Sequence, residues 1–493
     1  MRTLYRLSGA LLLCGAATPL LAGVSSEEAA KLGDELTPVG ANPAPNEDGS
    51  IPAWQGESLF TDAQKNYDPE DLEKLRKEAL AWQEAHPDLD PVENRADLDK
   101  LIEDSPRVGD LIRQIGREKT EPLFTITADN YREYADKLTE GHKALFELYP
   151  DTYEMTVYPS VRGAYYPDEI LAATRKNATR AELEGTDGVS GAKLGFPYPI
   201  PKNGAQVIWN HKLKYRGSAV KRYNDQVIVE ANGDYEITKL VEDVSFEYAN
   251  LNKTAEERDD DVLAYYLQET TYPRRVAGQF TLVHEIFGKD TSGRNAWIYN
   301  PGLGRVNRAP DVGYDNPSIG SDGMQFNDQV DMFNGSLNRY NWKLVGKKEM
   351  YIPYNSYMMN NPLAQYEEIV GKGHINPALP RYELHRVWVV EATLKEDTRH
   401  QFGKRVFYLD EDSWSIVAVD NYDNRGKLWR FQEGHLVTFP FIPTTTASPE
   451  AIYDLQSGRY MLTALTNEGE ISDFRITYDE GYFTPSRLSR RAR

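Results

Sequence analysis

The chain has 493 residues, of which 11% are aromatic, and it carries a formal charge of −20 at pH 7. This length allows an extensive hydrophobic core and one or two domains, and the aromatic content argues against a disordered chain. The acidic balance disfavours nucleic acid as a partner, because nucleic-acid-binding surfaces are basic.

The first 22 residues have the features of a secretory signal peptide. Arg2 and Arg6 precede an apolar run that ends at Leu13, and small residues surround Ala22 and Gly23. We expect cleavage after Ala22 or Gly23, which places the protein in the periplasm, with outer-membrane association left open. No later run approaches the ~20 apolar residues that a membrane span requires.

Cys14 is the only cysteine in the chain. Lipidation of Cys14 is the less favoured alternative, because Leu13 occupies a position where lipoprotein signals need a small residue. The mature chain would then have no cysteine for disulfides, thiol catalysis or metal binding. Removal of Arg2 and Arg6 changes the formal charge from −20 to −22.

Residues 23–204 are expected to form helices and extended segments that pack on a sheet. Ser25 or Ser26 caps a short helix, and the proline and glycine content of residues 33–56 predicts a strap packed by Trp54. Amphipathic or capped segments predict further helices over 68–86, within 88–119, from Thr127 to 150 and over 167–183. The role of the acidic segment 58–120 is not evident from its sequence.

Residues 205–493 are expected to form a curved antiparallel β-sheet domain with a short basic tail, whose first long strand begins at Ala205. Asn232-Gly233 is a strong hairpin signal, and a last hairpin is expected over 457–478. The most regular pattern is 381–432, where a strand around Trp388 precedes a hairpin of 405–409 and 414–419. Both faces of these strands are apolar, which fits either a sheet covered on both sides or a concave face that lines an apolar cavity.

Several of these segments resemble a known bacterial envelope family. VWVVEATL, KRVFYLDEDSW and YDNRGKLWR, together with LTPVGA, GSIPAW and FTITADNYREY, are similar to domain of unknown function 1329, whose members resemble the LolA/LolB lipoprotein-sorting proteins. The resemblance implies an α+β fold: a large curved antiparallel sheet, a LolA/LolB-like half-barrel, with helices and extended N-terminal straps packed on it.

Motifs for catalysis and metal binding are missing from the sequence. It contains no G-x-S-x-G, H-E-x-x-H, Walker or paired-cysteine motif. Asp420, Asp423 and Asn424 faintly suggest a calcium loop, but Tyr422 and Arg425 occupy positions that need a ligand and a glycine, so a hairpin turn is favoured. No catalytic residue, metal ligand or cofactor is therefore predicted.

We expect a non-catalytic periplasmic carrier or chaperone for a hydrophobic molecule, such as a lipid, a sterol-like compound or a lipoprotein acyl chain, in traffic with the outer membrane. The alternative is an interaction module without a ligand cavity, which partners an efflux-type transporter or an outer-membrane protein. The tail supports at most a weak peripheral membrane contact, through Arg487, Arg490, Arg491 and Arg493. The candidate cavity wall consists of Trp297, Tyr299, Trp388, Phe407, Trp414 and Trp429.

Overall fold

The computed structural model describes residues 23–493, except 67, 93, 109–120, 255, 259–261, 288–292, 310–313, 362, 480 and 492–493. The expected signal peptide, Cys14 and Arg493 lie outside the described residues. Within the described part of the chain, each helix is too short or too polar to cross a membrane.

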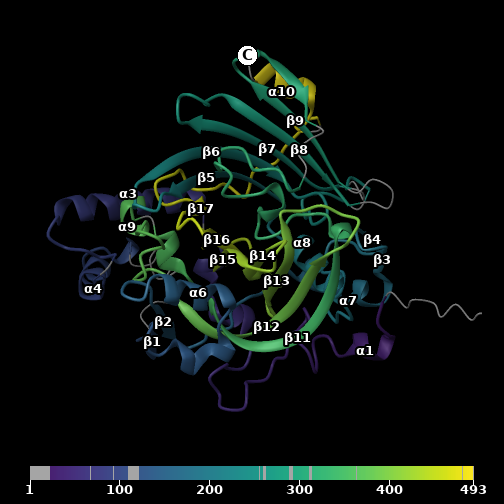
Figure 1. The fold of residues 1–493 in the computed structure, drawn as a ribbon, viewed down its shortest axis with the longest axis horizontal. Coiled ribbons are helices and arrows are strands. Elements are labelled where there is room, and N and C mark those ends of the chain that lie inside the picture. The colour runs from purple at the N-terminus through teal and green to yellow at the C-terminus, as the bar shows by residue number, and fades with distance from the viewer. Residues whose placement is uncertain are drawn as a thin grey trace, which may run out of the picture.

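One large sheet of 15 strands organises the molecule (Figure 1). Its order is β1-β2-β12-β13-β14-β15-β16-β17-β5-β6-β7-β8-β9-β10, with β11 paired to β12. All neighbours are antiparallel except β2 and β12, which run parallel. The described residues give β10 and β11 no second neighbour, so the sheet stays open. The predicted α+β class with a large antiparallel sheet is confirmed.

The strands have these bounds: β1 Phe124–Ile126, β2 Met155–Tyr158, β3 Glu182–Glu184, β4 Gly188–Ser190, β5 Ala219–Val229, β6 Tyr235–Ser245, β7 Val262–Tyr272, β8 Gln279–Ile286, β9 Gly293–Asn300, β10 Arg305–Arg308, β11 Tyr340–Pro353, β12 Tyr382–Leu394, β13 Phe402–Asp410, β14 Ile416–Asp423, β15 Leu428–Phe439, β16 Thr444–Asp454 and β17 Tyr460–Leu465. The helices have these bounds: α1 Ser26–Ala30, α2 Asp62–Lys65, α3 Pro69–Ala85, α4 Arg95–Asp104, α6 Glu140–Leu148, α7 Asp168–Arg180, α8 Gly204–Lys212, α9 Tyr366–Ile369 and α10 Pro485–Arg491.

The predicted strands over residues 381–432 are confirmed as β12, β13, β14 and the start of β15. Phe407 and Leu409 pack in one core cluster and Tyr408 in another, on opposite faces of the sheet. Helix α6 packs against β14 and β15 on the Tyr408 side, and α8 packs against β11 and β12 on the Phe407 side. This part of the sheet is therefore covered on both faces.

Strict alternation would place Ile416 and Ala418 on one face of the sheet and Val417 and Val419 on the other, but β14 departs from this pattern at one point. Tyr408 pairs with Ala418, but the next residue, Leu409, pairs with Ile416, so a bulge leaves Val417 without a partner in the ladder. A bulge shifts the alternation by one residue. Val417 and Ala418 consequently share one core cluster, while Ile416 and Val419 share the other. Trp414 precedes the strand, in a turn with a φ of 57°.

Three further expectations are corrected by the structure. The chain from 204 to 212 is helix α8 rather than a strand, because Asn203 caps it by accepting a hydrogen bond from the backbone N–H of Gln206. The helix expected from Thr127 divides into a 3-10 helix, Tyr131–Lys137, and α6, which Thr139 caps. The expected hairpin over 457–478 is a single strand, β17, which pairs with β16 and β5.

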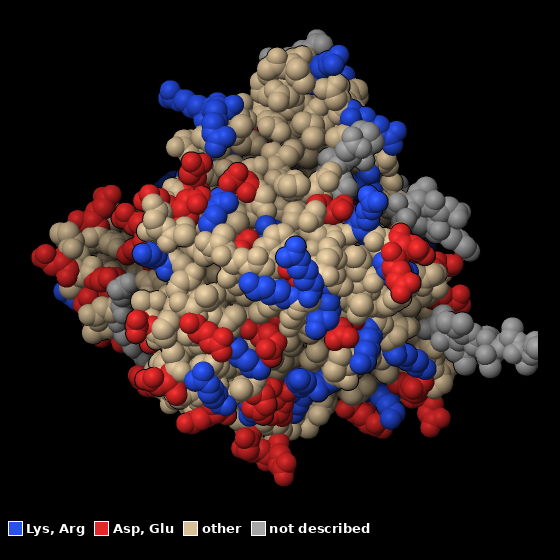
Figure 2. Space-filling view, in the orientation of Figure 1, with Lys and Arg blue, Asp and Glu red and all other residues tan. Residues whose placement is uncertain are grey.

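The C-terminal helix α10 packs on β8, β9 and β10. Its Leu488 is buried beside Phe280 and Tyr299, and Arg491 forms ion pairs with Asp243 and Glu269. Acidic side chains crowd the lower and left parts of the face in Figure 2, whereas the upper end, formed by β7–β9 and α10, carries mostly neutral and basic side chains.

Candidate functional site

A cavity of about 350 Å³ opens over one face of strands β5 to β9. Strands β16 and β17 form another part of its wall, and the segment 316–334, which connects β10 to β11, covers it. A second cavity of about 190 Å³ adjoins it and shares Arg222, Asn224, Phe439 and Phe474 as lining residues. The larger cavity falls within the size range of small-molecule binding sites.

The alternation of side chains along the strands builds this wall. Every second residue points into the cavity, as for Val220, Arg222, Asn224 and Gln226 on β5, Ala264, Tyr266 and Gln268 on β7, and Thr281, Val283 and Glu285 on β8. The intervening residues of β7 and β8, such as Leu267 and Leu282, pack beneath α10. The cavity face thus mixes apolar and polar residues, whereas on the opposite face an apolar cluster packs beneath α10.

The covering segment is fixed to the sheet by buried polar contacts. The Asp328 carboxylate accepts from the Arg405 guanidinium at 2.6 Å, and the Gln329 side-chain amide donates to Gln432 at 2.9 Å. Asp331 pairs with Arg216 and with Lys214. Because these contacts hold the segment against several strands, it forms a fixed roof for the cavity, while Val330 is exposed at its edge.

The electrostatics of the cavity depend on burial. Lys214 and Arg216 beside Asp331 hold the pKa of that carboxyl below its usual range. Glu450 on β16 has its pKa raised to about 8 by burial and by repulsion from Asp331. Burial also lowers the pKa of Lys212, whose ammonium group donates to the carbonyl of Gly335 at 2.6 Å.

The six residues predicted to form a cavity wall lie in three other places. Trp297 and Tyr299 belong to the layer beneath α10. Trp388, Phe407 and Trp414 lie in the core under α8, where the rings of Trp388 and Trp414 stack at 5.8 Å. Trp429 packs against Phe326 and Phe402. None of the six lines the cavity over β5–β9, and their role in ligand binding stays a prediction.

Residue alternation could have pointed to the observed wall. Ile298, between Trp297 and Tyr299, lines the cavity and pairs with Thr281, which also lines it. The large aromatic residues of β9 were the more conspicuous signal in the sequence, but they lie on the opposite face of the same strand. The polar members of the cavity face, such as Arg222, Glu242 and Gln268, carry no motif, so only their positions on neighbouring strands reveal them.

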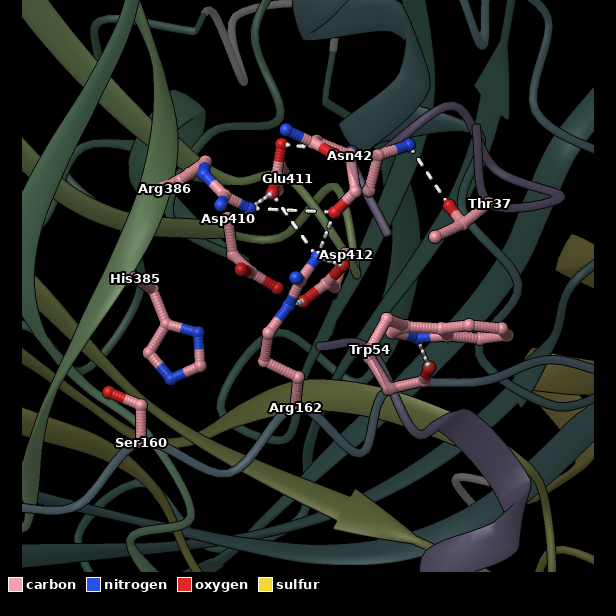
Figure 3. A network of polar contacts seen from close by, with 12 residues as sticks. Thr37, Asn42, Trp54, Ser160, Arg162, His385, Arg386, Asp410, Glu411 and Asp412 are labelled. Atoms are coloured by element: carbon pink, nitrogen blue, oxygen red, sulfur yellow. Dashed lines mark hydrogen bonds and ion pairs between the residues drawn. The ribbon is translucent and has the colours of Figure 1, made fainter. Parts of the chain in front are cut away.

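A second polar cluster joins the N-terminal strap to the turn between β13 and β14 (Figure 3). The buried Arg162 guanidinium donates to both oxygens of Asp412 at 2.8 Å and to Glu411 at 3.2 Å. It also donates to the backbone carbonyls of Asn42 and Pro52 at 2.7 and 3.2 Å. This cluster fixes the strap through Arg162, whereas the sequence led us to expect Trp54 to pack it.

The same cluster contains the one group of three described side chains that could together ligate a metal: His385, Asp410 and Asp412. Burial and repulsion from Asp412 raise the pKa of Asp410 to about 6. Four cations already form ion pairs with three carboxylates here: Arg162 with Glu411 and Asp412, Lys347 and Arg386 with Glu411, and Arg381 with Glu383. Asp410 instead accepts hydrogen bonds from the backbone N–H and the hydroxyl group of Ser413. A divalent cation would meet no surplus negative charge, so the residues do not fit a metal site.

The hairpin interpretation of the weak calcium pattern is confirmed. Asp423 accepts hydrogen bonds from the backbone N–H groups of Arg425 and Lys427 at 2.8 and 2.9 Å and so closes the β14–β15 turn. Asp420 lies on the strand and accepts from the backbone N–H groups of Glu140 and Gly141 at the start of α6. Both carboxylates therefore have structural partners.

Comparison with known proteins identifies relatives of this chain. A family model described as "Protein of unknown function (DUF1329)" matches residues 125–489. An uncharacterized protein of Pseudomonas aeruginosa is 42% identical over 483 residues, which cover 98% of this chain and 97% of that protein.

Three similar solved structures cover a smaller part of the chain. A domain from Vibrio parahaemolyticus, provisionally described as an outer membrane lipoprotein-sorting protein, has a TM-score of 0.40 at 16% identity and covers 58% of this chain and 98% of its own. A DUF1329 family protein from Desulfovibrio piger has a TM-score of 0.38 at 14% identity, with 55% and 92% covered. A LolA superfamily protein from Nitrosomonas europaea has a TM-score of 0.35 at 10% identity, with 58% and 98% covered.

Proposed function

The chain belongs to the family DUF1329, and from this premise we propose that it is a non-catalytic periplasmic carrier of a hydrophobic molecule. The observation that carries the proposal is the cavity of about 350 Å³ over β5–β9. Its wall is part of the sheet, and ion pairs of Asp328 and Asp331 hold the covering segment 316–334 in place. A preformed cavity of this kind lowers the ordering cost of binding.

Apolar burial would supply the binding energy. Val220, Val244 and Ala264 form a small buried cluster with Phe246 and Phe474, and all five residues line the cavity. Transfer of apolar surface from water to such a wall is worth roughly 25 cal/mol per Å². A lipid, a sterol-like compound or an acyl chain in traffic with the outer membrane would each present such a surface.

A cavity-filling substitution tests the proposal. Thr281→Trp places a large ring in the cavity from β8, so we expect binding of the neutral dye N-phenyl-1-naphthylamine to weaken at least tenfold at an unchanged thermal midpoint. Ile298→Trp on the paired strand repeats the test. Thr271→Trp, at an exposed position near the end of β7, is the matched control.

Native mass spectrometry of wild-type protein isolated from the periplasm, followed by lipid extraction, gives an independent measurement. A co-purified apolar molecule that Thr281→Trp excludes supports the carrier function. Wild-type protein that binds neither the dye nor any extracted lipid would contradict it and would leave the interaction module for a transporter or outer-membrane protein as the better hypothesis.

A further inference from the structure

The turn between β7 and β8 and the turn between β9 and β10 lie side by side at one end of the sheet. A Cβ atom added at Gly278 in the first turn would lie 3.4 Å from Pro301 in the second, and Phe280 pairs with Tyr299 where the strands leave these turns. Helix α10 reaches the same place, because the guanidinium carbon of Arg491 lies 5.8 Å from the centre of the Phe280 ring. Strands β7–β9 and α10 form the upper end of the molecule in Figures 1 and 2.

The charge of this end is opposite to that of the whole protein. Residues 271–279 and 300–308 contain no aspartate or glutamate, although the full chain has a formal charge of −20. They contain four exposed arginines: Arg274, Arg275, Arg305 and Arg308. One of these, Arg275, forms an exposed ion pair with Glu236 on β6 at 3.4 Å, and such a pair is weak in water. The end of the sheet therefore attracts an anionic surface.

The same turns expose large apolar and aromatic side chains. Leu303 in the β9–β10 turn is 63% exposed, the highest value among the exposed large hydrophobic side chains of the described residues. Tyr272, the last residue of β7, is 49% exposed. A single exposed leucine needs no explanation. Leucine and tyrosine beside several arginines, however, form the combination that favours a membrane interface, where the tyrosine ring lies at the level of the head groups.

The arrangement of these side chains favours a bilayer as the partner. Leu303 projects from a turn, and the arginines lie beside it in the same two turns and at the start and end of β10. A bilayer offers apolar chains to the leucine and lipid phosphates to the guanidinium groups. The acidic remainder of the protein is repelled by anionic lipids, and the β5–β6 turn, with Glu230 and Asp234, limits the basic surface on one side.

We propose that turns 273–278 and 301–304 dock the protein reversibly on a membrane surface that contains anionic lipids. Helix α10 contributes the exposed Arg487 and Arg490 beside the turns, whereas Arg491 is held in ion pairs with Asp243 and Glu269. The proposal does not depend on the occupant of the cavity.

Sedimentation of the mature protein with lipid vesicles tests the electrostatic part. Addition of about 30% phosphatidylglycerol to phosphatidylcholine vesicles should tighten binding at least tenfold, and an increase of NaCl from about 0.05 M to about 0.5 M should reverse most of this gain. The double substitution Arg274→Gln and Arg275→Gln should weaken binding at least fivefold at an unchanged thermal midpoint. Arg425→Gln with Lys427→Gln, in the exposed β14–β15 turn, removes the same charge and is the matched control. Equal weakening by both pairs would contradict a localised docking surface.

A fluorescent label tests whether the β9–β10 turn enters the bilayer. Cys14, the only cysteine, lies in the expected signal peptide, so Leu303→Cys gives the mature chain a single site for a nitrobenzoxadiazole dye. We expect vesicles with phosphatidylglycerol to shift the dye emission to shorter wavelength, and we expect no shift for Leu123→Cys, which replaces another exposed leucine.

Three outcomes would overturn the membrane proposal. The first is that the wild type does not bind these vesicles, and the second is that it binds without an emission shift at position 303. The third is that soluble polyglutamate binds as tightly as the vesicles, which would assign the basic end to an acidic macromolecule instead. Each of these outcomes leaves the carrier function untouched, because the cavity is tested separately.

Discussion

Glu450 illustrates how the cavity wall controls a single ionisable group. Its carboxylate accepts a hydrogen bond from the backbone N–H of Met332 at 3.1 Å, and burial together with the charge of Asp331 raises its pKa to about 8. The neutral carboxyl group is therefore favoured in the folded protein near pH 7. In the unfolded chain the same group ionises near its ordinary value of 4.5.

This difference predicts a pH-dependent effect of Glu450→Gln. The folded protein holds the proton more tightly than the unfolded chain, so the contribution of Glu450 to stability is present at low pH and is lost as the pH rises toward 8. Between about pH 5 and pH 8, the free energy of unfolding of the wild type should fall relative to that of Glu450→Gln, by up to about 1.4 kcal/mol per pH unit. Urea unfolding of both proteins across this range measures the difference. A difference that does not change with pH would contradict the assigned shift.

At the scale of elements, the N-terminal strap depends on buried ion pairs rather than on regular secondary structure. Arg162 is 1% exposed and connects the strap carbonyls to the acidic turn after β13. The side chain of Trp54 is only half-buried and donates one hydrogen bond, to Ala164. Contacts with the turn after β13 therefore fix the position of the strap.

Arg162→Met should destabilise the protein strongly. The change leaves the buried Asp412 carboxylate without its guanidinium partner, and removal of one partner from a buried ion pair costs about 3–5 kcal/mol. Arg475→Met is a suitable control, because its pair with Asp68 is exposed to solvent and such pairs contribute little to stability. Thermal and urea unfolding compare the variants, and equal losses for the two would show that the strap cluster contributes nothing beyond a surface pair.

At the scale of the whole molecule, one open sheet performs two tasks. Strands β11–β15 are covered on both faces by helices and loops. Strands β5–β9 have the roofed cavity on one face, and α10 packs on the other face of β8 and β9. The cavity therefore lies over the half of the sheet where one face of the strands is mainly apolar and the other face mixes apolar and polar residues. The upper end of the molecule in Figure 2 has few acidic side chains, although the protein as a whole is acidic.

At this scale we make a prediction about the location of the protein. We expect the mature chain to begin near Gly23 or Val24 and to be released by osmotic shock, because Val24 is already packed in a core cluster with Ala29 and Leu32. N-terminal sequencing of the released protein measures the start of the chain. Recovery in the detergent fraction with an acylated Cys14 would contradict this prediction.

The fold of residues 381–432 could be predicted from the sequence because strand alternation and turn residues act locally. Runs such as Val387–Val390 have a strong strand preference, and Asn424-Arg425-Gly426 closes a turn in which Gly426 has a φ of 78°. The same local reasoning succeeded for α1, α3 and α7, whose capping residues or amphipathic patterns are present in the chain. It was wrong for Gly204–Lys212, because a short buried segment around Val207, Ile208 and Trp209 fits a helix as well as a strand.

Tertiary structure alone decided which face of each strand borders a cavity. Trp297 and Ile298 are adjacent in the sequence, yet one packs with the layer beneath α10 and the other faces the cavity. The bulge at Val417 shifts the alternation within β14 by one residue. The strand contains no glycine or proline that would mark this bulge in the sequence. The sequence by itself determined the class of fold, because strand period and turn chemistry are local properties. The site depended on register, bulges and the distant segment 316–334, because these are set by contacts between residues far apart in the chain.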